Sequence, residues 1–148
     1  MVVAKPGSWA APYAAGTTFK FNGWQIRLDP AQVGITAPDI VGDEPAPAGH
    51  TFVLVPMTST RAALGSEEPV LGLNLAFVGG NGVVYTSFPV VDGQEYWCPG
   101  ADDDWINGPE LYQGGTASVS ACRLVASDAI SGGRWRLRGD AGEVFVRP

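Results

Sequence analysis

One stretch of the chain, residues 95–108, carries most of the side chains that could do chemistry. Three consecutive aspartates form its densest group of charges, and aromatic side chains flank them. Carboxylates beside exposed rings are typical of a surface that binds a protein or a sugar, because rings supply contact area and carboxylates supply direction. We therefore predict a partner- or ligand-binding site made of Tyr96, Trp97, Asp102, Asp103, Asp104 and Trp105.

The same carboxylates raise the question of a metal or of catalysis. Calcium takes clustered oxygen ligands, but an EF-hand loop that begins at Asp102 places Ile106 at a ligand position, and one that begins at Asp103 places Trp105 there. We predict no metal, and keep an irregular calcium site or a carbohydrate site in loop 95–108 as the alternative. Glycoside cleavage is a third hypothesis, which needs two carboxyl groups converging at about 5–9 Å.

His50 is the only histidine in the chain. A Ser–His or Cys–His mechanism would have to use it, because such a nucleophile needs a positioned base. It stands between Gly49 and Thr51 where we expect a strand to begin, and the chain has no Gly-x-Ser-x-Gly elbow. We therefore expect a surface histidine in a turn, no catalytic residue, no enzyme activity and no cofactor.

Cys98 and Cys122 are the only two cysteines. They form no CxxC motif and have no neighbouring histidine, which argues against zinc. We predict a disulfide between them, and closing its loop of roughly 25 residues would contribute about 3–4 kcal/mol. Two buried thiols in a cytosolic protein and a reactive cysteine are the alternatives. A disulfide indicates an oxidising compartment outside the cytoplasmic membrane, and Trp97 could pack on it instead of binding a partner.

Composition limits the class of protein. A chain of 148 residues fits one domain. Hydrophobic residues make up 45% and charged residues 16%, a balance that excludes intrinsic disorder. The net charge of −6 argues against nucleic acid or an anionic membrane as a partner, because both require a basic patch. The uncharged stretch 69–91 is interrupted by glycines, asparagines and a proline, so we expect two strands there and no membrane span.

Alternation of apolar and polar residues with a period of two dominates the chain, whereas no long stretch has helical periodicity. Trp24 and Trp135 stand in such alternation and should lie in the core, while Arg134, Arg136 and Arg138 should share a solvent face. Pro56 should limit the hydrogen-bond ladder of its strand on one side. Single helical turns are expected at 62–64 and 109–112, and strands at 17–21, 24–29, 51–58, 70–78, 83–87, 116–125, 134–138 and 143–147.

Eight or nine short strands joined by turns predict an all-β fold, an antiparallel sandwich or barrel with no substantial helix. Four segments in order then suggest a family: a proline-rich turn leading into a valine-rich strand (44–58), a first hairpin (16–28), an Asn-Gly-x-x-Tyr turn (81–85) and the approach to Cys122 (109–122). Together they resemble small exported immunoglobulin-like proteins of actinobacteria, the DUF4352 group related to telokin-like and MPT63-like secreted antigens. The resemblance implies an immunoglobulin-like β-sandwich outside the membrane, with no catalytic residues to carry over.

The start of the chain shows no basic segment followed by an apolar one, as a signal peptide would have. We expect residues 1–15 to be a flexible N-terminal segment that remains after removal of an export signal. Alternatively, a lipid-anchor segment preceded it. Residues 16–148 should form one immunoglobulin-like domain. The expected function is non-enzymatic: an exported or cell-surface module that binds another cell-envelope or extracellular protein, or serves as an accessory subunit.

Overall fold

Two long strands, β4 (His50–Arg61) and β9 (Thr116–Ala126), pair antiparallel over eleven residues of each strand, and β4 is the central strand of the larger sheet. Their many valines and threonines favour an extended backbone. On the other edge of β4 lies β2 (Trp24–Leu28), which pairs in turn with β1 (Thr18–Phe21), and the short β3 (Gln32–Val33) also pairs with β4. These five strands make up the larger sheet.

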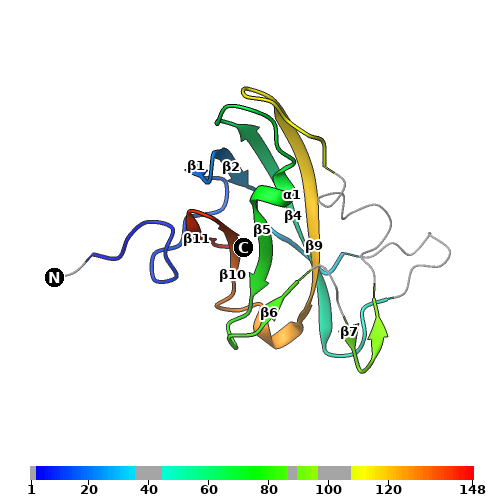
Figure 1. Ribbon diagram of the computed structural model, residues 1–148. Helices are drawn as coiled ribbons and strands as arrows, with labels where there is room; N and C mark the ends of the chain where they lie inside the picture. The colour runs from blue at the N-terminus through cyan, green and yellow to red at the C-terminus, as the bar shows by residue number, and fades with distance from the viewer. Residues whose placement is uncertain (1–2, 36–44, 87–89, 97–107) are drawn as a thin grey trace.

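The structure is a computed structural model, and it describes residues 3–35, 45–86, 90–96 and 108–148. Within these residues the smaller sheet has the order β11 (Gly142–Val146), β10 (Arg134–Gly139), β5 (Asn74–Val78) and β6 (Val84–Tyr85). The two sheets face each other and enclose the core (Figure 1). The architecture is therefore an all-β sandwich, which confirms the predicted fold class.

A separate two-stranded ribbon, β7 (Val90–Val91) and β8 (Gln94–Glu95), lies beside the larger sheet, near the end where β4 begins (Figure 1). The described residues contain eleven strands, more than the eight or nine expected, because the two-residue strands β3, β7 and β8 are too short to show a period-two pattern. Within the same residues, no helix is long and apolar enough to cross a membrane.

Pro56 interrupts the pairing on one edge of β4. The amides of Asp29 and Gly34 donate to the carbonyls of Pro56 and Phe52, and carbonyls of alternate residues point to the same side of a strand. Thus β2 and β3 share an edge of β4, where β2 pairs as far as Met57 and β3 begins opposite Leu54. Proline has no amide hydrogen to donate there, so the predicted limit on one side of the ladder is confirmed.

The short helical elements differ from expectation. The strand expected over 70–78 begins only at Asn74, because α1 (Pro69–Gly72) takes up the preceding residues with Pro69 in its first turn. Neither 62–64 nor 109–112 forms the expected helical turn. A three-residue helix, η2 (Ser127–Ala129), follows β9 instead.

The core lies between the sheets and contains the two tryptophans predicted for it. Trp24 and Trp135 are fully buried, and Phe77 meets Trp135 edge to face with 5.0 Å between ring centroids. Arg123 is a buried exception on β9: its guanidinium donates to the carbonyl of Leu75 on β5 at 3.0 Å and to that of Cys122 at 2.6 Å. It thereby joins the two sheets.

Residues 7–16 belong to the sandwich, although we expected the domain to begin at residue 16. The amides of Tyr13 and Arg147 exchange hydrogen bonds with the carbonyls of Phe145 and Tyr13, at 3.0 and 2.8 Å, and Phe145 donates to Gly7 at 2.7 Å. The ring of Tyr13 stacks on Phe19 with 4.6 Å between centroids. The segment satisfies backbone groups along the outer edge of β11, so the boundary predicted at residue 15 is wrong.

The arginines of β10 share one face as expected, but their surroundings differ. The guanidinium carbon of Arg134 lies 5.2 Å from the ring centroid of Trp9, in the N-terminal segment. Arg138 is exposed and pairs with Glu143 at 3.0 Å. Burial, followed by the neighbouring charge of Arg138, lowers the pKa of Arg136. Of these three arginines, only Arg138 is therefore exposed, as the alternating pattern predicts for all of them.

Candidate functional site

Tyr96 is the only member of the predicted binding loop that the structure describes together with its surroundings. Its side chain is partly buried against Phe52, Cys122 and Leu124, on the outer face of the larger sheet. We expected an exposed side chain, whereas Tyr96 is partly buried, and its part in binding a partner stays a prediction. The remaining predicted site residues lie outside the described residues, and the predictions for them stay predictions: Trp97, Asp102, Asp103, Asp104 and Trp105.

Of the two cysteines in the predicted disulfide, only Cys122 lies among the described residues. Cys122 is 2% exposed and lies opposite Leu54 in the β4–β9 pair. With Phe52 and Leu124 it forms a buried group on the outer face, the outer cluster, against which Tyr96 packs. Cys98 lies outside the described residues. The pairing of Cys98 with Cys122 therefore stays a prediction, as does the oxidising compartment that depends on it.

His50, the only histidine, lines a pocket where the edges of the two sheets meet. We call this the end pocket, and its volume is about 230 Å³. It lies at the end of the sandwich where β4 begins, between β6 of the smaller sheet and the ribbon strand β7. Its lining residues are His50, Val83, Val84, Tyr85, Thr86, Val90, Val91 and Leu124.

The end pocket is open to solvent, and its walls are partly apolar and partly polar. Val83, Val84 and Val90 are 47%, 43% and 56% exposed, so three of the large apolar side chains that face solvent surround one cavity. An exposed cluster of this kind marks a binding surface more often than scattered single residues do. Leu124, which is buried, closes its floor and connects it to the outer cluster.

Two polar groups border the end pocket with defined roles. Nδ1 of His50 lies 3.1 Å from the carbonyl oxygen of Ala48. Because a carbonyl only accepts, Nδ1 must carry the hydrogen, which leaves Nε2 of the neutral ring as an acceptor. The hydroxyl of Tyr85 accepts a hydrogen bond from the amide of Asn81 at 3.3 Å. The pocket thus offers an apolar wall with a hydrogen-bond acceptor beside it.

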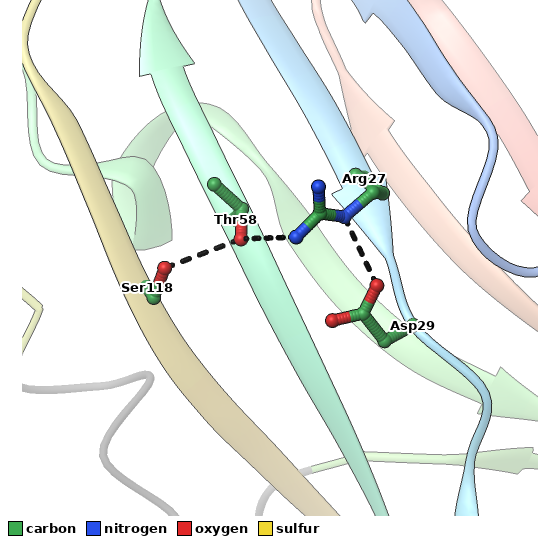
Figure 2. Close-up of polar contacts among 4 residues, drawn as sticks. All are labelled: Arg27, Asp29, Thr58 and Ser118. Atoms are coloured by element: carbon green, nitrogen blue, oxygen red, sulfur yellow. Dashed lines mark hydrogen bonds and ion pairs between the residues drawn. The ribbon is translucent and has the colours of Figure 1, made fainter.

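The outer face of the larger sheet carries a second, polar depression, which we call the hydroxyl groove. Its volume is about 210 Å³. Nε of Arg27 donates to Oδ1 of Asp29 at 3.0 Å, and Nη2 of Arg27 donates to Oγ1 of Thr58 at 3.4 Å. Thr58 shares a further hydrogen bond with Oγ of Ser118 at 3.2 Å, so the four side chains form one network across three strands and the end of β2 (Figure 2). The groove is lined by Arg27, Asp29, Pro56, Met57, Thr58, Ser118, Val119 and Ser120.

The outer face of the larger sheet has a covered apolar half and an exposed polar half, and the hydroxyl groove lies at the start of the polar half. Near the start of β4, Phe52 and Leu54 are buried on this face, and Phe52 belongs to the outer cluster, which Tyr96 partly covers. Near its end, Thr58 and Thr60 alternate with the inward-facing Met57 and Ser59 and stay partly exposed. Pro56 lies at the change from the covered half to the polar half. The groove therefore begins where the cover ends.

The residues that form both cavities stand in recognisable sequence patterns, but those patterns do not show which segments lie side by side. Thr58 and Thr60 alternate in one strand, and Thr116 and Ser118 in another, but only the register places Thr58 opposite Ser118. The valines of the end pocket come from a predicted hairpin, and their exposure depends on the neighbouring sheet. Within the described part of the chain, no three His, Cys, Asp or Glu residues are grouped to hold a metal ion.

The fold defines the chain as a β-sandwich protein, and comparisons with known proteins agree. No protein-family model matches the chain, and no curated protein does. An uncharacterized β-sandwich protein from Clostridium difficile 630 is similar in structure, with a TM-score of 0.57 and 9% identity over 92% of this chain and 93% of that chain. A conserved hypothetical protein from Bacillus anthracis has a TM-score of 0.55 and 14% identity over 90% of this chain and 94% of its own. At such identities the similarity shows the fold alone.

Proposed function

We propose that the chain is a non-enzymatic binding module, and that it recognises another protein by holding one apolar side chain of that protein in the end pocket. The observation that carries this proposal is the grouping of the exposed Val83, Val84 and Val90 around one cavity. Removing such surface from water favours association at roughly 25 cal/mol per Å². A cavity, unlike a flat patch, also selects the shape of its occupant.

The size of the end pocket supports a side chain as its occupant. Cofactor and drug-sized ligands occupy pockets of about 300–1,000 Å³, and about 230 Å³ is less than that. A cavity of about 150 Å³ already holds benzene. An aromatic side chain therefore fits, and an indole is favoured because its N–H could donate to Nε2 of His50.

The non-enzymatic part of the proposal rests on the composition of the pocket. Among the described residues, the eight that line it include no carboxylate and no cysteine that could pair with His50. This proposal also moves the binding surface away from loop 95–108. Calcium or carbohydrate binding in that loop stays a separate prediction, tested by replacing its three aspartates and Trp105 with alanine.

The second part of the proposal concerns where the protein acts. We propose that the module works outside the cytoplasmic membrane, with another cell-envelope or extracellular protein as its partner, as the resemblance to exported actinobacterial proteins suggests. The support is the predicted Cys98–Cys122 disulfide, because such bonds persist in oxidising compartments. Membership of the DUF4352 group is part of the same proposal.

A titration with blocked amino acids tests the end pocket. We expect N-acetyl-tryptophanamide to shift the backbone amide signals of Val84, Tyr85 and Leu124, and N-acetyl-alaninamide to leave them in place. Val84→Asp should abolish these shifts, because it puts a charge on the rim. Leu71→Asp is the matched control, since Leu71 is exposed on α1 and does not line the pocket.

The partner itself is tested with the same variants. A protein cross-linked by the wild-type chain should be lost with Val84→Asp and kept with Leu71→Asp. Absence of any shift with N-acetyl-tryptophanamide, or equal loss of the partner in both variants, would refute the end pocket as the binding site.

A further inference from the structure

The hydroxyl groove is chemically unlike the end pocket and lies on a different part of the surface. It is part of two adjacent rows of exposed or partly exposed polar side chains that run across the strands on the polar half of the larger sheet. The register gives one row as Thr18, Arg27, Thr58 and Ser118, and the next as Lys20, Gln25, Thr60 and Thr116. The first row carries the groove.

The groups of the groove retain unused hydrogen-bonding capacity. Arg27 uses Nε for Asp29 and Nη2 for Thr58, which leaves Nη1 without a partner among the described residues. Asp29 uses Oδ1 and leaves Oδ2 to accept. The hydroxyl of Ser118 can both donate and accept. Fixed donors, fixed acceptors and a hydroxyl thus lie within one network (Figure 2).

Charge narrows the class of ligand. Asp29 neutralises Arg27 at 3.0 Å, so the groove offers little attraction to an anion, and the whole chain carries a net charge of −6. A neutral molecule with several groups that donate and accept is the better complement. Sugars have this chemistry, and the ring of Pro56 provides an apolar surface for their C–H groups.

The backbone geometry argues against an extended peptide as the occupant. Peptides that add to a sheet pair with the backbone at its edge. The hydroxyl groove lies on the face of the sheet, over β2, β4 and β9, and its central strand, β4, is paired with β2 on one side and with β9 on the other. On this face the side chains of Arg27, Thr58 and Ser118 are the groups presented to a ligand, and they suit a small polar ring.

We propose that the hydroxyl groove binds a neutral saccharide, one pyranose ring at a time, through Arg27, Asp29, Thr58 and Ser118. The groove is shallow, and the described residues that line it include no aromatic side chain. The expected dissociation constant is therefore on the order of 1 mM, for a hexose of roughly twelve non-hydrogen atoms.

Nuclear magnetic resonance with methyl glycosides of glucose, galactose, mannose and N-acetylglucosamine tests the proposal. We expect at least one glycoside to shift the Nε–H signal of Arg27 and the amide signals of Thr58 and Ser118. Thr58→Val removes one hydroxyl and keeps the branched shape, and should weaken binding at least about fivefold, the loss expected for one hydrogen bond. Thr60→Val is its matched control, because Thr60 bonds to Thr116 at 2.7 Å in the neighbouring row and does not line the groove.

A second pair of variants tests the charge argument. Arg27→Gln should abolish binding, whereas Arg138→Gln should not, although Arg138 and Glu143 form an exposed ion pair with the same 3.0 Å separation as Arg27 and Asp29. The proposal is overturned by any of three results: no shift at about 50 mM glycoside, well above the expected dissociation constant; stronger shifts with sodium sulfate; or equal loss in Thr58→Val and Thr60→Val. Val84→Asp should leave saccharide binding intact, so this test is independent of the end pocket.

Discussion

Arg61 lies over the indole ring of Trp24, with 5.0 Å between its guanidinium carbon and the ring centroid. The same guanidinium pairs with Glu67 at 2.9 Å, and its side chain is only 11% exposed. Trp24 is thus closed off at the end of the core by a cation that is itself held by a carboxylate. This arrangement ties the segment between β4 and α1 to the first hairpin.

Replacing that cation should destabilise the fold. Arg61→Ala removes the cation–π contact and leaves Glu67 without its partner, so we expect a loss of about 1–2 kcal/mol in the free energy of unfolding. Urea denaturation measures it. Arg138→Ala is the control, because exposed ion pairs contribute about 0–1 kcal/mol and Arg138 is 56% exposed. Equal midpoints for the two variants would contradict the role given to Arg61.

Arg123 should matter more than any exposed arginine. Arg123→Ala would leave a cavity and deprive the Leu75 carbonyl of its donor from β9, with an expected loss of about 3 kcal/mol or more. Arg123→Met retains most of the volume and should cost clearly less. Denaturation of both variants distinguishes the two contributions. Wild-type stability in the alanine variant would show that Arg123 does not hold the sheets together.

Gly7 should control attachment of the N-terminal segment. It has a φ of +83°, and a Cβ there would approach Tyr13 and Val144 to 2.7 Å. We expect Gly7→Ala to release the segment, seen as faster chymotrypsin cleavage after Trp9 and Tyr13. Gly16→Ala is the control. Gly16 has a φ of +84° and open space where the methyl group would lie, so this variant has the same backbone strain as Gly7→Ala but no clash. Identical cleavage rates in the two variants would argue against this role.

The predicted disulfide has a direct test by intact mass. In denaturant without reductant, neither thiol should react with an alkylating agent, and both should react after reduction. Reduction should also lower the stability by about 3–4 kcal/mol, the value for a closed loop of roughly 25 residues. If both thiols alkylate in denaturant alone, Cys98 and Cys122 are unpaired, and the proposal of an exported protein loses its support.

Local sequence patterns were sufficient to predict strands and burial where the outcome depends on a residue and its immediate neighbours in the chain. Alternation at Trp24 and Trp135 predicts both strand and burial, because a strand places successive side chains on opposite faces. The missing donor of Pro56 predicts a break on one edge of its strand. The same reasoning fails at Val70, whose apolar neighbours suggest a strand while Pro69 begins a helical turn.

The candidate sites depend on distances that a pattern does not contain. Val84 and Leu124 come together only because β6 of one sheet lies beside β9 of the other. Thr58 and Ser118 meet through a register that spans sixty positions. Tyr96 looked exposed because it stands among acidic residues, yet it packs on an apolar half of the outer face that loop composition does not reveal.

The hydrogen bonds between Tyr13 and the last strand have a consequence for the order of folding. The first hairpin, β1 and β2, needs only neighbouring residues and could form early in synthesis. The contact of Tyr13 with Val146 joins residues near opposite ends of the chain. On a ribosome, which releases the chain from its N-terminus, this edge of β11 would stay open until Val146 had emerged. Residues 7–16, although translated before the first hairpin, would therefore take their place only after it.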